Sequence, residues 1–397
     1  MADSVAETIK LAERVNRIGA SATLAVLQDA ERLRAQGIDV VDFGPGEPDF
    51  PTPDHIKQAA VRALEENFTK YTPTPGIPPL RKAVCDWHAR ELGSRYEPRE
   101  CVVTVGGKHG VFEALSALVG RGDPVLIPAP YWVSFPEIVN YLGGRPVPVP
   151  TDEAGGFKVT AADLERAWVD GTRAVILNSP CNPSGAVIEA GEFERILALC
   201  RRRGAWLLSD ECYSHFVYDG APFSVASLAD AKPHVIVVGS LSKTFSMTGW
   251  RIGYVLAPEP IAQPVTRLQS HSTSNPTSIA QKAALAALTG SMEPVKTMLA
   301  EYARRRARVL EGLRAIPSLS CTTPQGAFYV YPNARVWMER AGVRTTTELA
   351  RRLLDDAHIA IVPGEAFGTE HHFRLSYATS MDRIELGLQR LTRFFSS

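Results

Sequence analysis

The sequence VIVVGSLSK, residues 235–243, places a lysine directly after an apolar, β-branched run and a turn of small residues. Such a run is typical of a strand that is buried on both faces of a sheet. A lysine at the end of a buried strand is unusual, because desolvation opposes its positive charge. The position of Lys243 therefore indicates a function for its amine.

Five more short apolar runs repeat the strand pattern of residues 235–238, and helical segments separate several of them. The runs cover residues 102–105, 125–127, 174–177, 206–208 and 254–256, and helical spacing is clearest at 162–169 and 192–203. Alternation of strands and helices predicts an α/β fold whose largely parallel sheet is covered on both faces.

Residues able to do chemistry follow five of these predicted strands. They are Gly106-Gly107-Lys108, the segment 128–132 ending in Trp132, the segment 178–183 with Asn182, the segment 209–213 with Asp210, and Lys243. Taken singly, the Gly-Gly pair is usually a turn, the aspartate a helix cap and the tryptophan a core residue. Together they predict a binding site, because open α/β sheets bind ligands at the carboxyl ends of their strands. The glycines fit neither the dinucleotide fingerprint nor the P-loop.

The composition of the 397-residue chain excludes several classes of protein. Its 43 Lys and Arg balance 43 Asp and Glu, which argues against a nucleic-acid surface or an acidic tail. No apolar run approaches the about 20 residues that span a bilayer, and residues 1–33 lack the apolar core of a signal peptide. The six cysteines show no CxxC spacing, so we expect reduced thiols and a cytoplasmic protein.

The chain has no repeats and no long linker, so we expect one large domain and a smaller one. Residues 22–34 predict a helix that ends at Gly37, and the proline-rich segment 44–53 is typical of a crossing between domains. We place the large domain at residues 47–290, and the small domain at 1–46 together with 291–397.

Residues 240–253, SLSKTFSMTGWRIG, resemble the pyridoxal 5′-phosphate (PLP) lysine motif of class I aminotransferases. These belong to the fold-type I PLP enzymes, the aspartate aminotransferase superfamily. The resemblance extends from residues 44–50, GPGEPDF, to residues 373–377, FRLSY. It implies a fold-type I transferase with a mostly parallel large domain and a smaller α+β domain, PLP as cofactor, and a homodimer.

The resemblance also implies catalytic roles for residues of this chain. Lys243 would form the Schiff base with PLP and, once displaced by substrate, carry the proton between the substrate Cα and the cofactor. Asp210 would keep the pyridine nitrogen protonated, which makes the ring an electron sink. Tyr213 and Asn182 would hydrogen-bond the 3′-oxygen of the ring, and Trp132 would stack on its face.

A second group of residues would bind the cofactor phosphate. The group consists of backbone N–H groups at Gly107 and Lys108, the Ser240 hydroxyl and the Arg251 guanidinium. Tyr71 matches a tyrosine that reaches the phosphate bound by the other subunit. The resemblance therefore implies active sites that are shared across a dimer interface.

Substrate recognition would depend on Arg374, which matches the arginine that binds the α-carboxylate with help from Asn182 and the backbone at Gly44. An arginine that some relatives place five residues before the asparagine of the pair Ser274-Asn275, on a loop from the partner subunit, is here Ser270. Lys108 and Ser21-Ala22-Thr23 instead match a bacterial subgroup, so Thr23 and Asn275 join the expected substrate contacts. The resemblance thus favours ping-pong transfer from aspartate to 2-oxoglutarate.

Other functions share most of these motifs. Prephenate, aromatic or broad-specificity aminotransferases remain open, because one apolar wall discriminates weakly. A PLP-dependent C–S lyase or an aminocyclopropane carboxylate synthase-like enzyme would keep the same lysine, aspartate and arginine. A regulator with an aminotransferase-like domain would need a DNA-binding module, for which residues 1–44 are too few and too balanced in charge. We expect no metal site.

Overall fold

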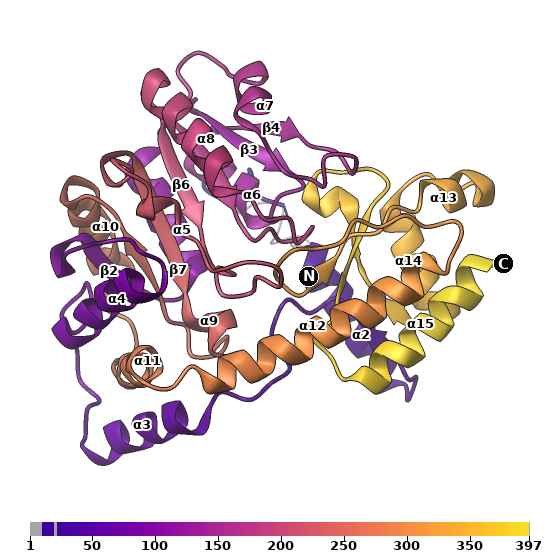
Figure 1. Ribbon diagram of the computed structural model, residues 1–397, viewed down its shortest axis with the longest axis horizontal. Helices are drawn as coiled ribbons and strands as arrows, with labels where there is room; N and C mark the ends of the chain where they lie inside the picture. The colour runs from indigo at the N-terminus through magenta and orange to yellow at the C-terminus, as the bar shows by residue number, and fades with distance from the viewer. Residues whose placement is uncertain (1–9, 20–21, 397) are drawn as a thin grey trace.

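A computed structural model describes residues 10–19 and 22–396, without the side chains of residues 22–27. Its centre is a seven-stranded sheet of order β2-β8-β7-β6-β5-β3-β4 (Figure 1). Only β8 runs antiparallel to its neighbours, so the prediction of a largely parallel sheet is confirmed. The strands are β2 (Cys101–Thr104), β3 (Pro124–Ala129), β4 (Arg145–Pro150), β5 (Ala174–Asn178), β6 (Trp206–Asp210), β7 (Val235–Ser240) and β8 (Gly253–Leu256).

Helices cover both faces of this sheet, as the strand pattern predicts (Figure 1). Along β7, Val235 and Val237 pack into the core on one face, whereas Ile236 and Val238 pack into the core on the other. The first core includes α4 (Pro78–Glu91), α8 (Ala190–Arg203) and α11 (Ser278–Thr289), and the second α5 (Gly107–Leu118), α6 (Ser134–Leu142) and α10 (Glu259–Ser272). The two predicted helices correspond to α7 (Ala161–Arg166) and α8, although α7 ends three residues earlier than expected.

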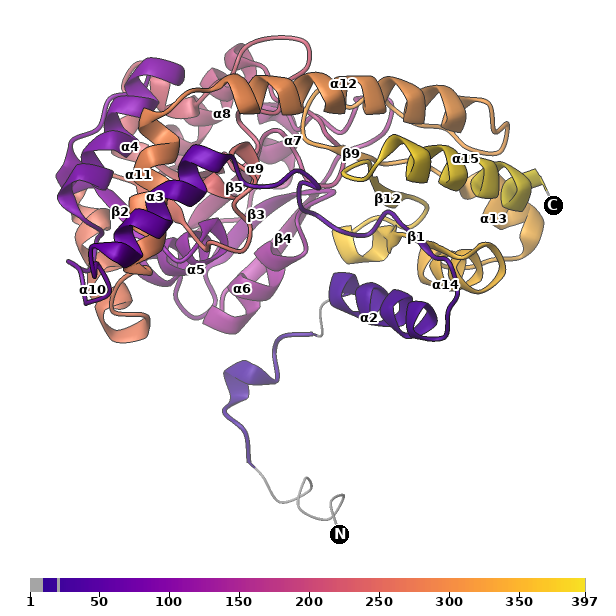
Figure 2. The ribbon, with the colours of Figure 1, turned by 90° about the horizontal axis from the view of Figure 1, so that it is seen from below.

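The C-terminal part of the chain forms a further core around a small antiparallel sheet of order β11-β12-β9. The long helix α12 (Glu293–Arg314) leads from the large sheet to this region and packs on α15 (Figures 1 and 2). The other elements here are β9 (Tyr329–Val330), β11 (Val362–Pro363), β12 (Phe373–Ser376), α13 (Arg335–Ala341), α14 (Thr346–Ala357) and α15 (Met381–Ser396).

The N-terminal segment joins the C-terminal core. Helix α2 (Ala22–Ala35) follows the predicted bounds and is succeeded by Gly37, whose φ of 82° is a left-handed conformation. Strand β1 (Val41–Asp42) then pairs in parallel with β10 (Ile359–Ala360). The chain next crosses to α3 (Asp54–Glu65), which packs on α11, through residues Phe43–Pro53, called here the strap segment.

The remaining helices are short. They are α9 (Leu241–Thr244) and 3-10 turns at Glu13–Val15, Pro98–Glu100, Val225–Ser227, Lys232–His234 and Gly364–Phe367. Over residues 10–19 and 22–396, no helix has the length and apolar character needed to cross a membrane.

Candidate active site

Strands β2, β3, β5, β6 and β7 all end at one edge of the large sheet, called here the carboxyl edge. Antiparallel β8 lies between β2 and β7, so these two strands run in the same direction. The chemical groups predicted to follow the strands therefore lie along a common edge, as expected for an α/β sheet.

Lys243 lies in α9, directly after β7. Its Nζ donates a hydrogen bond to the carbonyl oxygen of Gly46 in the strap segment. Burial lowers the pKa of the Lys243 amine below its ordinary value, and the positive charges of Arg374 and Arg251 lower it further. A lysine in this environment deprotonates more readily than one in water, which suits a nucleophile or a base.

Asp210 is the last residue of β6 and is 7% exposed. One carboxylate oxygen accepts a hydrogen bond of 3.0 Å from the backbone N–H of Cys212. Burial raises the pKa of Asp210 to about 6, while the Cys212 bond and nearby Lys243 act in the opposite direction. A buried carboxylate with a raised pKa gains stability from a cationic partner, and a protonated ring nitrogen is such a partner.

An anion-binding cradle surrounds the N-terminus of α5. The first N–H groups of this helix have no helical acceptor, and Gly106 precedes them with a φ of 81°. The guanidinium of Arg251 lies so close that a Cβ on Gly106 would be 2.4 Å from its Nη2. The side chain of Ser240 closes the cradle, because a Cβ on Gly107 would be 3.1 Å from its Cβ.

Arg374 lies in β12 and is 2% exposed. Its Nη1 donates to Asn182 Oδ1 at 3.0 Å and its Nη2 to the carbonyl oxygen of Gly44, while Nε has no partner within the described residues. A buried guanidinium that has no carboxylate partner among the described residues is ready to bind one from a ligand. The ring of Tyr329 lies beneath Arg374, with its centroid 4.6 Å from the guanidinium carbon.

Tyr213 and Trp132 also reach the carboxyl edge. The hydroxyl of Tyr213 hydrogen-bonds that of Tyr329 at 2.7 Å, and burial raises the pKa of Tyr213 well above its usual value. The Nζ of Lys108 lies 5.0 Å from the centre of the Trp132 ring. Burial, followed by the charge of Arg251, lowers the pKa of Lys108.

These residues fit PLP. The cofactor needs an amine for its aldehyde, a carboxylate for its ring nitrogen and an anion site for its phosphate. The charge of Lys243 acts on the pKa of Asp210, and the cradle of Gly106, Gly107, Ser240 and Arg251 surrounds the N-terminus of α5 at the same edge of the sheet.

Two predicted site residues, Tyr71 and Asn275, make no hydrogen bond to this group within the described residues, and the side chain of a third lies outside them. Tyr71 is 90% exposed. The side-chain amide of Asn275 donates to the carbonyl oxygen of neighbouring Pro276. Thr23 lies in α2, but its side chain lies outside the described part of the structure, as does all of Ser21.

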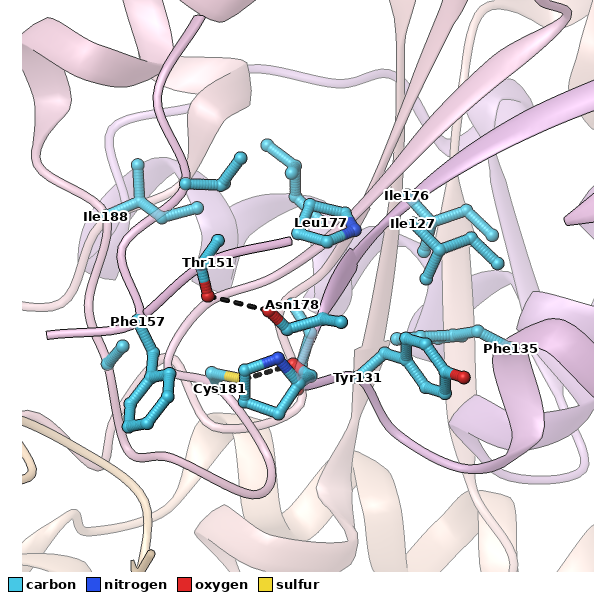
Figure 3. Close-up of a pocket in the computed structure, with 15 residues that line it drawn as sticks. Ile127, Tyr131, Phe135, Thr151, Phe157, Ile176, Leu177, Asn178, Cys181 and Ile188 are labelled. Carbon is cyan, nitrogen blue, oxygen red and sulfur yellow. Dashed lines mark hydrogen bonds between the residues drawn. The ribbon is translucent and has the colours of Figure 1, made fainter. Parts of the chain in front are cut away.

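A separate apolar pocket lies behind the ends of β3 and β5 (Figure 3). Its few polar groups are mostly bound within the wall: Thr151 Oγ1 donates to Ala129 O at 2.6 Å, and Cys181 Sγ to Pro130 O at 3.5 Å. None of Lys243, Asp210 and Arg374 lines it, although Asn178 at the end of β5 does.

Sequence reasoning missed Tyr329, the Gly46 carbonyl and the supporting role of Asn178. Asn178 ends β5; its Oδ1 accepts from the backbone N–H of Asn182, and its Nδ2 donates to Asp210 O. Asn178 follows a predicted strand, so its position could have identified it. Tyr329 belongs to a strand of only two residues, which gives no recognisable strand pattern.

Comparison with known proteins gives matches over nearly the whole chain. The family described as aminotransferase class I and II matches residues 38–391. A Geobacillus stearothermophilus protein named aspartate aminotransferase is 45% identical, covering 98% of this chain and 100% of the relative. An Aquifex aeolicus (strain VF5) protein named “Probable aspartate/prephenate aminotransferase” is 43% identical, covering 96% and 98%. The solved structure of aspartate aminotransferase from Thermus thermophilus with maleate has a TM-score of 0.93 and 41% identity, covering 97% and 100%.

Proposed function

The chain belongs to the family of class I and II aminotransferases, and on this premise we propose that it transfers the amino group of aspartate to 2-oxoglutarate. It is a PLP-dependent transaminase, which acts on an amino acid and a 2-oxo acid. Aspartate is supported as donor by the names of its relatives from Geobacillus stearothermophilus and Bacillus subtilis (strain 168). Lys108 supports it independently, because a cation at the carboxyl edge complements a second carboxylate.

When bound, PLP supplies the electron sink that makes the substrate Cα–H acidic. Lys243 Nζ then takes up the Cα proton and later delivers it, which requires an amine that is unprotonated near neutral pH. The burial of Lys243 beside Arg374 and Arg251 supports this role, since both factors lower its pKa. Asp210 holds a proton on the ring nitrogen through its buried carboxylate.

The other side chains orient the substrate. Arg374 binds the α-carboxylate, with Asn182 and the Gly44 carbonyl fixing the plane of its guanidinium. Trp132 would cover the cofactor ring and exclude water, while Tyr213 would donate a hydrogen bond to the ring oxygen. Gly107, Lys108, Ser240 and Arg251 would bind the phosphate, and Lys108 Nζ would also attract the distal carboxylate of the substrate.

One observation supports this proposal most strongly. A half-buried lysine in α9 and a buried arginine in β12 donate to carbonyl oxygens only two residues apart, at Gly46 and Gly44. The reacting amine and the carboxylate-binding group are thereby held on the same short piece of backbone. An α-amino acid likewise carries its amine and its carboxylate close together, on one carbon.

A single-turnover experiment tests the transfer. Aspartate added to the PLP-loaded protein should convert the cofactor stoichiometrically to its amino form, seen as a change in visible absorbance, and 2-oxoglutarate should reverse it. Release of ammonia and pyruvate without this conversion would identify a lyase and contradict the proposal. Lys243→Ala should lose the lysine-linked absorbance; a borohydride-stable link between cofactor and this variant would contradict the assignment of Lys243.

Prephenate transamination is the second candidate, because the Aquifex aeolicus relative bears that name. A panel of amino donors with prephenate and 2-oxoglutarate as acceptors distinguishes the two. A kcat/KM for prephenate above that for 2-oxoglutarate would replace the preferred acceptor, while leaving the transfer chemistry unchanged.

We also propose a homodimer with two domains per chain. The two cores beside the large sheet consist of residues between 56 and 295, whereas the third core consists mainly of residues after 297. This division supports a large domain at 47–290 and a small domain made of 1–46 and 291–397.

The exposed side chain of Tyr71 supports a dimer in which the partner subunit covers it. The six cysteines are all free thiols, which supports a cytoplasmic location.

A further inference from the structure

The backbone of the strap segment accepts hydrogen bonds from both Lys243 and Arg374. The Gly44 and Gly46 carbonyls accept hydrogen bonds from Arg374 and Lys243, and Phe43 O accepts from the backbone N–H of Ser376 at 2.8 Å. A Cβ on Gly46 would lie 2.9 Å from the hydroxyl of Tyr329, so the backbone fits tightly here. A small displacement of the strap segment would therefore move acceptors of both groups.

Asp49 anchors the strap segment to α12. Its Oδ1 accepts from the Tyr302 hydroxyl at 3.0 Å and from Arg305 Nη1 at 2.8 Å, and its backbone N–H donates to the same hydroxyl at 3.3 Å. The Tyr302 hydroxyl thus both accepts from and donates to one residue, which fixes the backbone and the side chain of Asp49 together. The neighbouring Phe50 ring packs edge-on against Tyr302 at 5.5 Å.

The two partners of Asp49 are themselves rigidly held. Tyr302 is fully buried and Arg305 is 6% exposed. Arg305 Nε donates to Glu301 Oε1 at 2.8 Å, and its guanidinium lies 5.3 Å from the ring centres of Phe50 and Tyr302. Only the arginine of these pairs is buried, since the side chains of Asp49 and Glu301 are 29% and 25% exposed, so we expect the pairs to hold geometry more than to add stability.

We propose that Asp49 is a positioning residue for transamination: it fixes the strap segment on α12 and so sets the place of the Gly44 carbonyl against Arg374. Asp49 makes none of the contacts of the polar site itself, so it acts through the backbone between residues 44 and 49. The inference rests on the proposed function of Arg374 as the carboxylate-binding group. Helix α12, which connects the two regions of the molecule, would thereby contribute to substrate affinity.

The chain offers a matched control on the next turn of α12. Arg308 binds Glu385 of α15 through two hydrogen bonds of 2.6 and 2.8 Å, and within the described residues neither side chain makes a hydrogen bond to the strap segment. Glu385→Gln therefore removes an ion pair from the same helix without releasing the strap. Comparison with Asp49→Asn separates positioning from general stabilisation of α12.

The experiment measures the affinity of the PLP-loaded protein for succinate, a dicarboxylate with no amino group to react. It also measures kcat and the KM values for aspartate and 2-oxoglutarate. Asp49→Asn should weaken succinate binding and raise both KM values, for aspartate and 2-oxoglutarate, roughly tenfold, since small misplacements are costly. Its kcat should fall less, and its cofactor absorbance should match the parent. Tyr302→Phe should weaken binding in the same direction, and the double variant should lose little beyond Asp49→Asn because both changes release one anchor.

Unchanged succinate affinity in both Asp49→Asn and Tyr302→Phe would overturn the inference, as would an equal loss in Glu385→Gln. Should Asp49→Asn fail to fold, Tyr302→Phe tests the same anchor. Arg374→Lys is measured in parallel. If it weakens succinate binding while the Asp49 and Tyr302 variants do not, only the positioning role fails; if it leaves binding unchanged, the proposed carboxylate site fails as well.

Discussion

Lys108 is the residue that most directly links this site to a substrate with two carboxylates. Lys108→Ala should raise KM for aspartate roughly tenfold or more, because a charge-assisted contact is lost. KM for alanine and phenylalanine, which have no second carboxylate, should change much less. Steady-state kinetics with the three donors check this. Similar increases for all of them would show that Lys108 serves the cofactor phosphate only.

Glu113 is a buried carboxyl that the proposed mechanism does not use. Its side chain is within reach of His109 at 3.4 Å and accepts from Ser272 at 3.2 Å, but Oε2 has no partner among the described residues. Burial raises the pKa of Glu113 from its ordinary 4.5 to about 8. The protonated form is therefore favoured in the folded protein. The stability that Glu113 contributes through this shift is fully present below pH 4.5 and is lost as the pH rises towards about 8.

Glu113→Gln should consequently leave Tm almost unchanged near pH 4.5 and raise it progressively up to pH 8. The corresponding gain in the free energy of unfolding is a few kcal/mol at most, because one pKa unit corresponds to about 1.4 kcal/mol. Thermal unfolding across this range measures it, with exposed Glu194→Gln on α8 as control. A Tm difference that does not vary with pH would show that Glu113 ionises normally.

At this scale the sequence predicts best those residues that follow long strands. Lys243, Asp210 and Asn182 were predicted at the carboxyl edge because an apolar run precedes each of them. Asp49 and Tyr302 are 253 positions apart, and nothing local in either segment indicates their contact. The packing of Tyr329 under Arg374 could not be predicted for the same reason, since it depends on the three-dimensional path of the chain.

At the scale of elements, the N-terminus of α5 depends on the close approach of β8. A Cβ on Gly253 would lie 2.4 Å from the backbone nitrogen of Gly107 and 2.8 Å from the carbonyl oxygen of Gly239. These are main-chain atoms, which cannot rotate away. Glycine at this position therefore keeps the anion cradle in place.

Gly253→Ala should separate β8 from α5, with a loss of stability of about 1–3 kcal/mol, typical of overpacking. It should also weaken cofactor binding. Equilibrium titration of the cofactor by absorbance, together with thermal unfolding, checks both effects. Gly191→Ala is the control, because its Cβ would meet nothing nearer than Arg195 Nη1 at 4.0 Å. Cofactor affinity like that of the control would refute the role of this contact.

The sequence predicted six strands of the large sheet but missed β4, and the reason is physical. Its sequence, Arg-Pro-Val-Pro-Val-Pro, contains three prolines, which cannot donate to a strand ladder and normally exclude a strand. β4 lies at the edge of the sheet, where only one side needs hydrogen bonds. β1 and β10, with two residues each, were also missed because they are too short to show any periodicity.

At the scale of the whole molecule, the exposure of Tyr71 suggests that one chain is incomplete. If Tyr71 serves the partner's site, subunits carrying Lys243→Ala and Tyr71→Phe should complement each other. In a mixed dimer, the site with an intact Lys243 would receive Tyr71 from the other subunit. Mixing the two variants under exchange conditions should then raise kcat/KM above that of either alone. No gain, with mixed dimers verified by mass spectrometry, would place Tyr71 in its own chain's site or outside any site.

The pairing of β1 with β10 has a consequence for biosynthesis. All strands of the large sheet lie between residues 101 and 256, so a growing chain can complete that sheet before the C-terminal region exists. In contrast, Val41 can pair with Ile359 only after the C-terminal region has been synthesised. The same holds for the hydrogen bond between the Gly44 carbonyl and Arg374. We therefore expect the nascent protein to possess Lys243 at the end of β7 before it possesses the arginine that selects its substrate. Aldehydes in the cell could meet Lys243 during that interval, and early capture of the cofactor would protect it.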